Sequence, residues 1–251
     1  MTKKENTLRV PAVEAGQAPQ AAGQAQGDKQ NKVAKKYEWP LRQKGGIYFH
    51  CGAIISRKNV FVTKEYMDLL VNAIKLAELK RDVKNLAYVI MPNYFYWLFK
   101  LPQNQEDPVA IYSEVKKNVA GEIMNNLKLE IKNGSYQMLD LFKNNSRVGR
   151  SKPERLLWTF EEQAKNFKDN KRYKIWAPKT GLRLIDNDEC LQKKLNSIKN
   201  AAVSERWQLA VRPEDYPYLF VADEMPEKEV YDCLKSFSTV IASPQLAALA
   251  S

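Results

Sequence analysis

The most informative stretch of this chain is Met91-Pro92-Asn93-Tyr94-Phe95-Tyr96-Trp97-Leu98-Phe99. Its Pro-Asn pair predicts a turn between two apolar segments. After the turn the large side chains alternate between the two faces of a predicted strand, with Tyr94, Tyr96 and Leu98 on one face and Phe95, Trp97 and Phe99 on the other. A strand that is apolar on both faces is typical of the centre of a sheet, so we expect it to be covered on both sides.

The neighbouring segments predict the rest of a domain that mixes strands and helices. Strands are predicted over 47–55 and over 86–90. Thr63 can cap a helix that ends near Leu79, and Pro108 suits the first turn of a second long helix. Apolar residues at helical spacing give each helix one stripe for packing. The predicted order is therefore strand, helix, strand, strand, helix.

The second half of the chain is less regular. Ser151 is the predicted cap of a helix, and an extended segment over 173–176 is predicted to continue at 181–185. Asp188 is the predicted cap of a last helix over about 189–202. No pair of carboxylates in this part of the sequence is placed convincingly for acid–base work, so we interpret these acidic residues as helix caps.

Two motifs carry a resemblance to a known family. Met91-Pro92-Asn93 and, further on, Arg212-Pro213-Glu214-Asp215-Tyr216 resemble the signatures of HUH-type single-tyrosine transposases, in particular their REP-associated and insertion-element relatives. The resemblance covers roughly residues 40–220. It implies an α+β, ferredoxin-like split βαβ fold with an antiparallel sheet and packed helices. It also implies a homodimer formed by joining two sheets.

The positions of the family's active site hold other residues in this chain. The family's signature continues as His-x-His, and those two histidines bind a divalent metal; here they are Tyr94 and Tyr96. Residues 194–203 resemble the family's catalytic helix, but the nucleophilic tyrosine falls on Ser197 and the third metal ligand on Ala201. A neutral phenol is a poor ligand and alanine is none.

We therefore expect no catalytic residue, no metal and no cofactor, although the family uses Mg²⁺ or Mn²⁺. The predicted function is that of a repurposed, transposase-like protein that binds nucleic acid without cutting it. Two alternatives stay open: an active DNA transposase with non-standard residues, Tyr94 or Tyr96 serving as nucleophile, and a non-catalytic scaffold for protein interactions.

The positive charge of the chain also favours binding to nucleic acid. The formal net charge is +11, which is typical of chains that meet nucleic acid, although basicity also serves solubility alone. Residues 143–174 interleave basic and aromatic side chains, a pattern that suits single-stranded or hairpin DNA or RNA, or else a solvated helix face over core aromatics. The predicted contacts with nucleic acid are Tyr94, Tyr96, Arg147, Arg150, Lys152, Arg155, Lys171, Arg172, Lys174 and Trp176. The two tyrosines could instead only fill space.

The remaining segments predict organisation and compartment. Residues 1–36 are polar and low in complexity and predict a disordered basic arm, 37–220 the transposase-like domain, and 221–251 a C-terminal helix and tail. The three cysteines, Cys51, Cys190 and Cys233, are far apart and predict reduced thiols in the cytoplasm. No apolar run approaches the length of a membrane span, and no secretory signal is recognisable, so no membrane partner is expected.

Overall fold

The structure is a computed structural model that describes residues 42–105, 107–143, 145–146, 148–168, 171–178 and 181–223. The chain divides into two units, Met1–Glu38 and Trp39–Ser251, and every described residue belongs to the second. The predicted N-terminal arm, the C-terminal helix, Arg147 and Cys233 lie outside the described residues.

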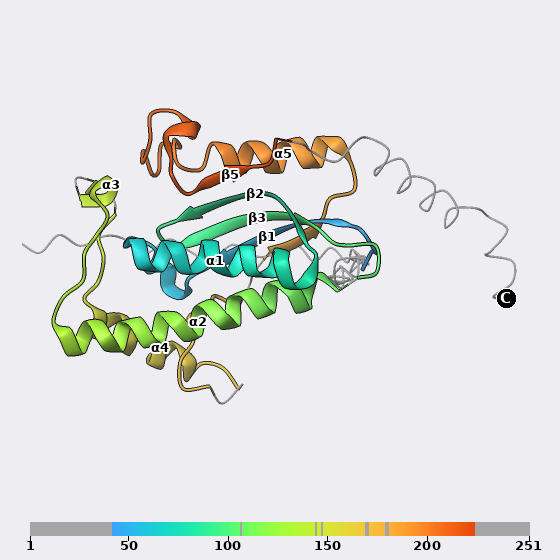
Figure 1. Cartoon of the computed structure of the whole chain (residues 1–251). Coiled ribbons are helices and arrows are strands. Elements are labelled where there is room, and N and C mark those ends of the chain that lie inside the picture. Colours follow the sequence, from blue (N-terminus) through green and yellow to red (C-terminus); the bar gives the residue numbers. More distant parts are fainter. Residues whose placement is uncertain are drawn as a thin grey trace, which may run out of the picture. The chain divides into compact units, whose positions relative to one another are not determined.

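The domain is built on one antiparallel sheet of five strands (Figure 1). In chain order the strands are β1 Ile47–Ala53, β2 Lys84–Met91, β3 Tyr94–Lys100, β4 Gly181–Leu184 and β5 Leu219–Val221. Their order across the sheet is β4-β1-β3-β2-β5, so β3 is central, as the quoted stretch predicts. Its neighbour β1 pairs with it in a register that sets Cys51 opposite Tyr96 and Gly52 opposite Phe95.

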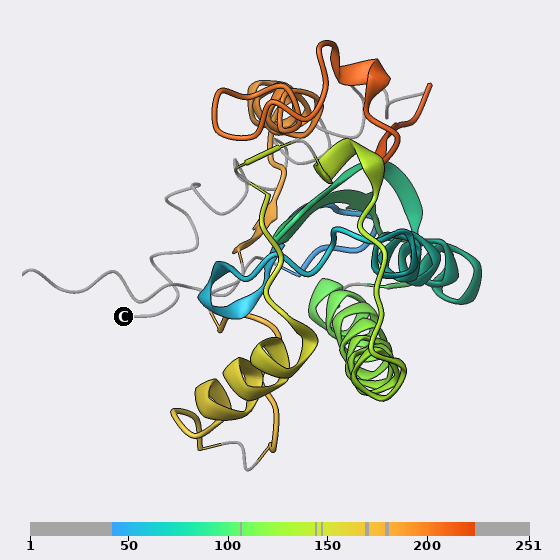
Figure 2. The same ribbon diagram turned by 90° about the vertical axis from the view of Figure 1, so that its left-hand side faces the viewer.

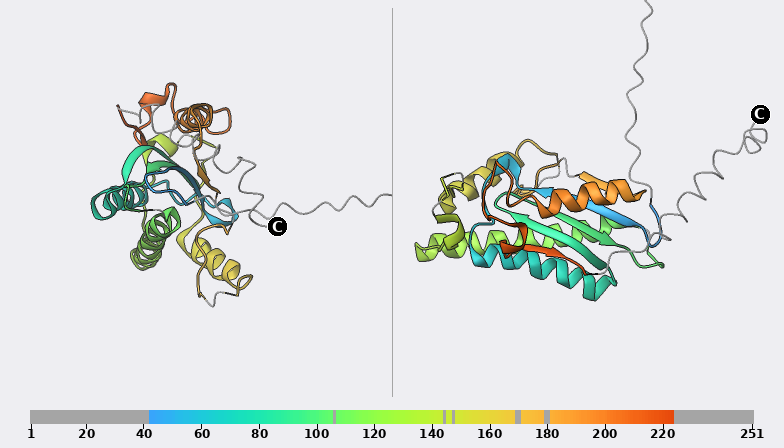
Figure 3. Two further views of the ribbon diagram at one scale, coloured as in Figure 1. Left: turned by 90° about the vertical axis from the view of Figure 1, so that its right-hand side faces the viewer. Right: turned by 90° about the horizontal axis from the view of Figure 1, so that it is seen from above.

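Helices cover both faces of the sheet, which confirms the α+β class (Figures 1 and 2). Helices α1 (Lys64–Arg81) and α2 (Pro108–Asn133) pack side by side on one face, with α4 (Pro153–Ala164) against α2. Helix α5 (Asp188–Lys199) lies over the other face, as the view from above shows (Figure 3). A one-turn helix, α3 (Asp140–Lys143), lies between α2 and α4.

Local sequence explains where the two long helices begin and which side they bury. The Thr63 hydroxyl accepts a hydrogen bond from the backbone N–H of Tyr66, which caps α1 as predicted. In α2 the Asp107 carboxylate caps the first turn, Pro108 occupies that turn, and Gly134 ends the helix in the left-handed region. The predicted apolar stripe of α2 is buried, namely Val115, Val119, Ile123 and Leu127.

Three predicted boundaries are wrong by a residue or more. Helix α4 is capped by Lys152 rather than by Ser151, and no side chain bonds to its first turn. Asn187, not Asp188, caps α5, because its side-chain oxygen accepts a hydrogen bond from the backbone N–H of Cys190. The predicted strand over 173–176 forms one isolated bridge, between Trp176 and Ile54, and regular pairing starts only at β4.

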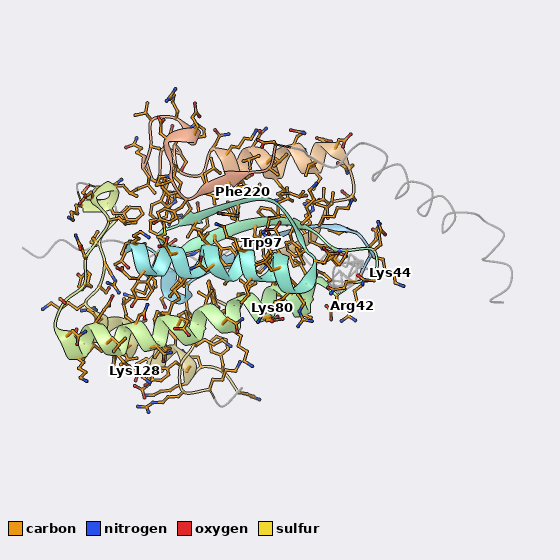
Figure 4. The ribbon with its side chains drawn as sticks, in the orientation of Figure 1. Arg42, Lys44, Lys80, Trp97, Lys128 and Phe220 are labelled. Carbon is orange, nitrogen blue, oxygen red and sulfur yellow. The ribbon has the colours of Figure 1, made fainter. Side chains whose placement is uncertain are left out.

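The core on the α1–α2 face is aromatic and tightly packed. Trp97 of β3 is fully buried, and its indole N–H donates a 2.9 Å hydrogen bond to the side-chain oxygen of Asn85 (Figure 4). Gly52 lies against the ring of Phe95, where a Cβ atom would come within 2.1 Å of a ring carbon. The position opposite Phe95 therefore admits no side chain.

The described helices include none that is long and apolar enough to cross a membrane.

Candidate functional site

The Met-Pro-Asn turn fixes a second loop beside the start of β3. The carbonyl of Pro92 accepts hydrogen bonds from the backbone N–H groups of Val60 and Phe61, at 2.9 and 3.0 Å. Asn93 is buried, and its side-chain amide donates to the carbonyl of Arg57 at 3.0 Å and to the side chain of Asn59 at 2.9 Å. The motif thus holds residues 57–61 in place next to the sheet.

This loop carries backbone strain. Ser56 and Arg57 have φ values of +54° and +51°, a region that residues other than glycine rarely adopt. Such strain persists only where surrounding contacts enforce it, and it is enriched at functional sites. Here the bond from Asn93 to the Arg57 carbonyl is one of those contacts, and the exposed Arg57 side chain acts electrostatically on Tyr96.

Four aromatic side chains form a continuous row on the sheet face that α5 covers. Phe49 of β1 contacts Tyr96 with ring centroids 5.2 Å apart, Tyr96 contacts Tyr94 at 4.9 Å, and Tyr94 contacts Trp207 at 6.2 Å. We call Phe49, Tyr96, Tyr94 and Trp207 the aromatic row. Two of its members occupy the positions that the sequence resemblance assigns to metal ligands.

Cations lie along the aromatic row. The ammonium of Lys194, on α5, is 4.6 Å from the ring centroid of Phe49, and the guanidinium of Arg206 is 5.2 Å from that of Trp207. Both distances are in the range of cation–π contacts. Arg57 acts on Tyr96, and Arg183 of β4 pairs in register with Phe49, so it lies on the same face.

The phenols of the row are neutral at physiological pH. Burial raises the pKa of Tyr94 to about 12, and the neighbouring Tyr96 adds to the rise while Trp207 and Arg206 oppose it. Burial also raises the pKa of Tyr96, with Cys51 adding and Arg57 opposing. A phenol that keeps its proton is neither a good metal ligand nor a good nucleophile.

Exposure separates the two tyrosines. Tyr94 is 9% exposed and is packed between Tyr96 and Trp207, so it fills the core of the row and does not offer its ring to a base. Tyr96 is half-buried. Of the two tyrosines predicted to touch nucleic acid, Tyr96 is therefore the one whose ring a ligand can reach.

The other two positions taken from the family lie on α5 and the turn after it. Ser197 is exposed, and its hydroxyl donates to the carbonyl of Lys193 at 2.8 Å rather than to a side chain that could serve as a base. Ala201 is buried one helical turn later. Helix α5 covers the sheet face that carries Tyr94 and Tyr96, and the rings of these two tyrosines contact each other, whereas Ser197 is exposed on the helix.

A divalent metal does not fit this donor set. Two protonated phenols and one methyl group replace the ligands that such an ion needs. Elsewhere in the described ranges, no group of three or more His, Cys, Asp or Glu side chains is arranged to hold a metal ion.

The second motif has a structural role. Arg212 forms an ion pair with Asp215 at 2.8 Å, which closes the turn around Pro213. The hydroxyl of Tyr216 is buried and donates a 2.7 Å hydrogen bond to the carbonyl of Ile90, at the end of β2. This motif therefore fastens the chain after α5 to the edge of the sheet.

The basic residues predicted to contact nucleic acid have different environments. Lys152 and Arg155 are exposed at the start of α4, and Arg172 is exposed and pairs with Glu161 at 3.3 Å. Lys171 and Lys174 line a separate cavity between α2 and the segment 171–178.

The prediction for Arg150 is wrong. Its side chain is fully buried, forms a 2.7 Å ion pair with Glu130 and lies between the rings of Tyr66 and Tyr136. A guanidinium held in this way cannot reach a phosphate, because both the carboxylate and the two rings cover it. Trp176 is also largely buried, with its indole N–H bonded to the carbonyl of Lys116, so one edge at most faces a ligand.

The cations around the aromatic row were not predicted. Arg57, Arg183, Lys194 and Arg206 come from four separate segments, so no local run of charge indicates them. Lys194 lies in residues 194–203, which resemble the family's catalytic helix, so it is the one member of the set that stands in a recognisable stretch of sequence. Only the fold assembles the set.

No protein-family model matches the chain, and no curated protein sequence matches it significantly. Among solved structures, it is similar to a REP-associated tyrosine transposase bound to a REP hairpin, with 16% identity over 76% of this chain and 94% of that chain and a TM-score of 0.46. The chain is also similar to a Deinococcus radiodurans R1 protein provisionally assigned as a transposase. The identity is 15% over 67% of this chain and 96% of that chain, and the TM-score is 0.36. Both structures are described as transposases, and at such identities and scores neither likeness assigns a family or a residue role to this chain.

Proposed function

We propose that this chain is a transposase-like protein that binds single-stranded or hairpin DNA or RNA and does not cut it. The observation that supports the proposal most is the set of four cations, Arg57, Arg183, Lys194 and Arg206, along the aromatic row. Cations hold a phosphate backbone, and the partly exposed Tyr96 offers a ring on which a base can stack.

The chemistry of the row favours holding over cutting. Strand cleavage by a tyrosine needs a nucleophile that can lose its proton and a metal that polarises the phosphate. Tyr94 and Tyr96 keep their protons because of burial, and Ser197 bonds to a backbone carbonyl. An active transposase would have to find both functions elsewhere in the chain.

Three further expectations belong to the same proposal. The resemblance implies a homodimer joined through the sheets, and the two edge strands, β4 and β5, have four and three residues. Strands this short offer few unpaired backbone groups for joining two sheets. The oligomeric state is measured directly by sedimentation at several protein concentrations. The division into an arm, a domain and a tail and the cytoplasmic location also stay predictions.

A binding assay on neighbouring lysines of α5 tests the proposal. Lys194 lies over Phe49 in the row, whereas Lys193 is exposed and pairs with Glu189 at 2.5 Å. Labelled DNA and RNA hairpins with single-stranded flanks are titrated with wild-type chain, Lys194→Gln and Lys193→Gln at several salt concentrations. We expect Lys194→Gln to weaken binding about tenfold and Lys193→Gln to change it less than about twofold.

The salt dependence gives an independent readout. Each lost phosphate contact lowers the slope of log affinity against log salt by about 0.7–0.9, and we expect this loss only in Lys194→Gln. Equal effects of the two variants would place the ligand elsewhere. Absence of salt-dependent binding to both hairpins would favour the protein-interaction scaffold.

A further inference from the structure

A second basic site lies away from the aromatic row. A cavity of about 570 Å³ opens between α2 and the segment 171–178 that follows α4. It is lined by basic and aromatic side chains and by one glycine, notably Tyr112, Lys116, Lys117, Gly121, Tyr173 and Trp176. Helix α2 covers the face of the sheet opposite α5, so this cavity is distinct from the row.

The walls of the cavity are held by backbone hydrogen bonds. The N–H of Lys174 donates to the carbonyl of Phe160 at 2.9 Å, and the carbonyl of Ile175 accepts from Ile55 at 2.8 Å. The indole of Trp176 donates to the carbonyl of Lys116 at 2.8 Å, which ties the segment directly to α2. The cavity is thus formed before any ligand arrives, which lowers the entropic cost of binding.

Lys116 is the central charge of this cavity. Its ammonium lies 5.7 Å from the ring centroid of Tyr112 and 5.4 Å from that of Trp176. Burial lowers the pKa of Lys116 to about 8, and repulsion from Lys174 contributes. Among the residues that the structure describes, no carboxylate forms an ion pair with Lys116.

Arg150 gives a contrasting arrangement within the same fold. Arg150 is buried between two rings as well, but Glu130 neutralises it at 2.7 Å. A partly buried cation without an anion is costly, and a bound anion removes that cost. At Lys116 the rings are present and no carboxylate of the described residues pairs with the ammonium, so the cavity is suited to receive an anion.

The remaining lining favours a ligand that is planar as well as anionic. Tyr112 is held by stacking on the buried ring of His50, with centroids 4.3 Å apart. With Tyr173 and the accessible edge of Trp176 it gives aromatic walls. The small residues Ala120 and Gly121 leave space on this side of α2, and a Cβ atom at Gly121 would have no neighbour within 4 Å. Aromatic walls beside a cation suit a base joined to a phosphate.

We propose that this cavity binds one nucleotide, with the phosphate at Lys116 and Lys117 and the base against the aromatic walls. The nucleotide comes either from a nucleic-acid strand, in which case the inference rests on the proposed function, or from solution as a mononucleotide. The ligand chemistry is the same in both cases.

Two lysines of α2 give a matched test. Lys116→Gln removes the charge in the cavity, and Lys128→Gln removes an exposed charge from the same helix outside it (Figure 4). Affinities of the full chain are measured for a short single-stranded oligonucleotide, for a nucleoside monophosphate and for inorganic phosphate. Circular dichroism confirms that both variants are folded, and Lys117→Gln at the rim serves as a second variant.

The proposal expects Lys116→Gln to weaken binding of the oligonucleotide, the mononucleotide or both by about tenfold, and Lys128→Gln by less than about twofold. Dependence on Lys116 with the oligonucleotide identifies a strand as the source, and dependence with the mononucleotide alone identifies a free nucleotide. If inorganic phosphate binds as tightly as the nucleoside monophosphate, the base contributes nothing and its proposed role is contradicted. Equal behaviour of the two variants, with Lys117→Gln also unchanged, overturns the site.

The outcome also separates this inference from the proposed function. If binding depends on Lys194 and not on Lys116, the proposed role of the aromatic row is supported and the proposed nucleotide site is contradicted. If the chain binds a mononucleotide through Lys116 but binds no hairpin, the nucleotide site is supported and the proposed function is contradicted.

Discussion

His50 is the one histidine of the chain, and its surroundings keep it neutral. It is fully buried on β1, stacks on Tyr112 and lies edge-on to Phe95 with ring centroids 5.5 Å apart. Burial lowers the pKa of His50 to about 3, and the positive charge of Lys116 adds to the effect. Its place in the core favours a packing role.

This neutral histidine predicts a loss of stability in mild acid. The unfolded chain takes up a proton at His50 below about pH 6.5, while the folded chain does not until about pH 3, so protons favour unfolding between these values. We expect the free energy of unfolding in urea to fall by about 2 kcal/mol between pH 7 and pH 5. Because there is one imidazole, its NMR signal is assigned without mutation, and a titration near pH 6.5 in the folded chain would contradict the prediction.

At the scale of single residues, the motif predicts that Tyr94 and Tyr96 share one strand face, whereas the basic run does not predict which of its cations is buried. Tyr94 and Tyr96 follow from one motif, and their neutrality follows from burial. The basic run predicts Arg150 as a phosphate contact, yet its side chain is fully buried and pairs with Glu130, which is twenty positions away in the sequence. A run of charge does not show which charges fold inward.

At the scale of elements, periodicity was a better guide than capping. The stripes of α1 and α2 and the alternation of β3 depend on many residues at once, and the structure confirms them. A cap depends on one residue's backbone angles, so Asn187 and Asp188 were equally good candidates by type. Strand β5 has three residues, too short for an alternation to be visible.

The glycine within α2 predicts a stabilising substitution. Gly121 lies in the exposed middle of the helix, and a Cβ there meets no atom within 4 Å. Gly121→Ala removes backbone freedom from the unfolded chain, so we expect the free energy of unfolding to rise by about 0.5–1 kcal/mol, measured by urea titration.

Gly52→Ala is the control for that prediction, with the opposite sign. Its Cβ would collide with the ring of Phe95, which His50 and Trp176 hold in place, so we expect a loss of roughly 1–3 kcal/mol. A destabilising Gly121→Ala would mean that α2 is more closely packed at this point than the structure shows.

At the scale of the whole molecule, the sheet separates two basic aromatic sites. The aromatic row lies under α5 on one face, and the nucleotide cavity lies beside α2 on the other. The fold class and the central strand were predictable, because hydrophobic alternation fixes them. The cations of the row were not, because they come from segments that are far apart in the sequence. Of the cavity's lining, Lys171, Lys174 and Trp176 stand in or beside the predicted basic segment, whereas Lys116 and Lys117 come from α2 and were not among the predicted contacts.

A cleavage assay tests the central claim most directly. Purified chain is incubated with a labelled DNA hairpin and Mg²⁺ or Mn²⁺, and covalent protein–DNA adducts and strand nicks are resolved by denaturing electrophoresis. Because the phenols of the row keep their protons and the metal-ligand positions hold no suitable donors, we predict salt-sensitive binding without nick or adduct. A metal-dependent adduct that disappears in Tyr96→Phe or Ser197→Ala would contradict the claim.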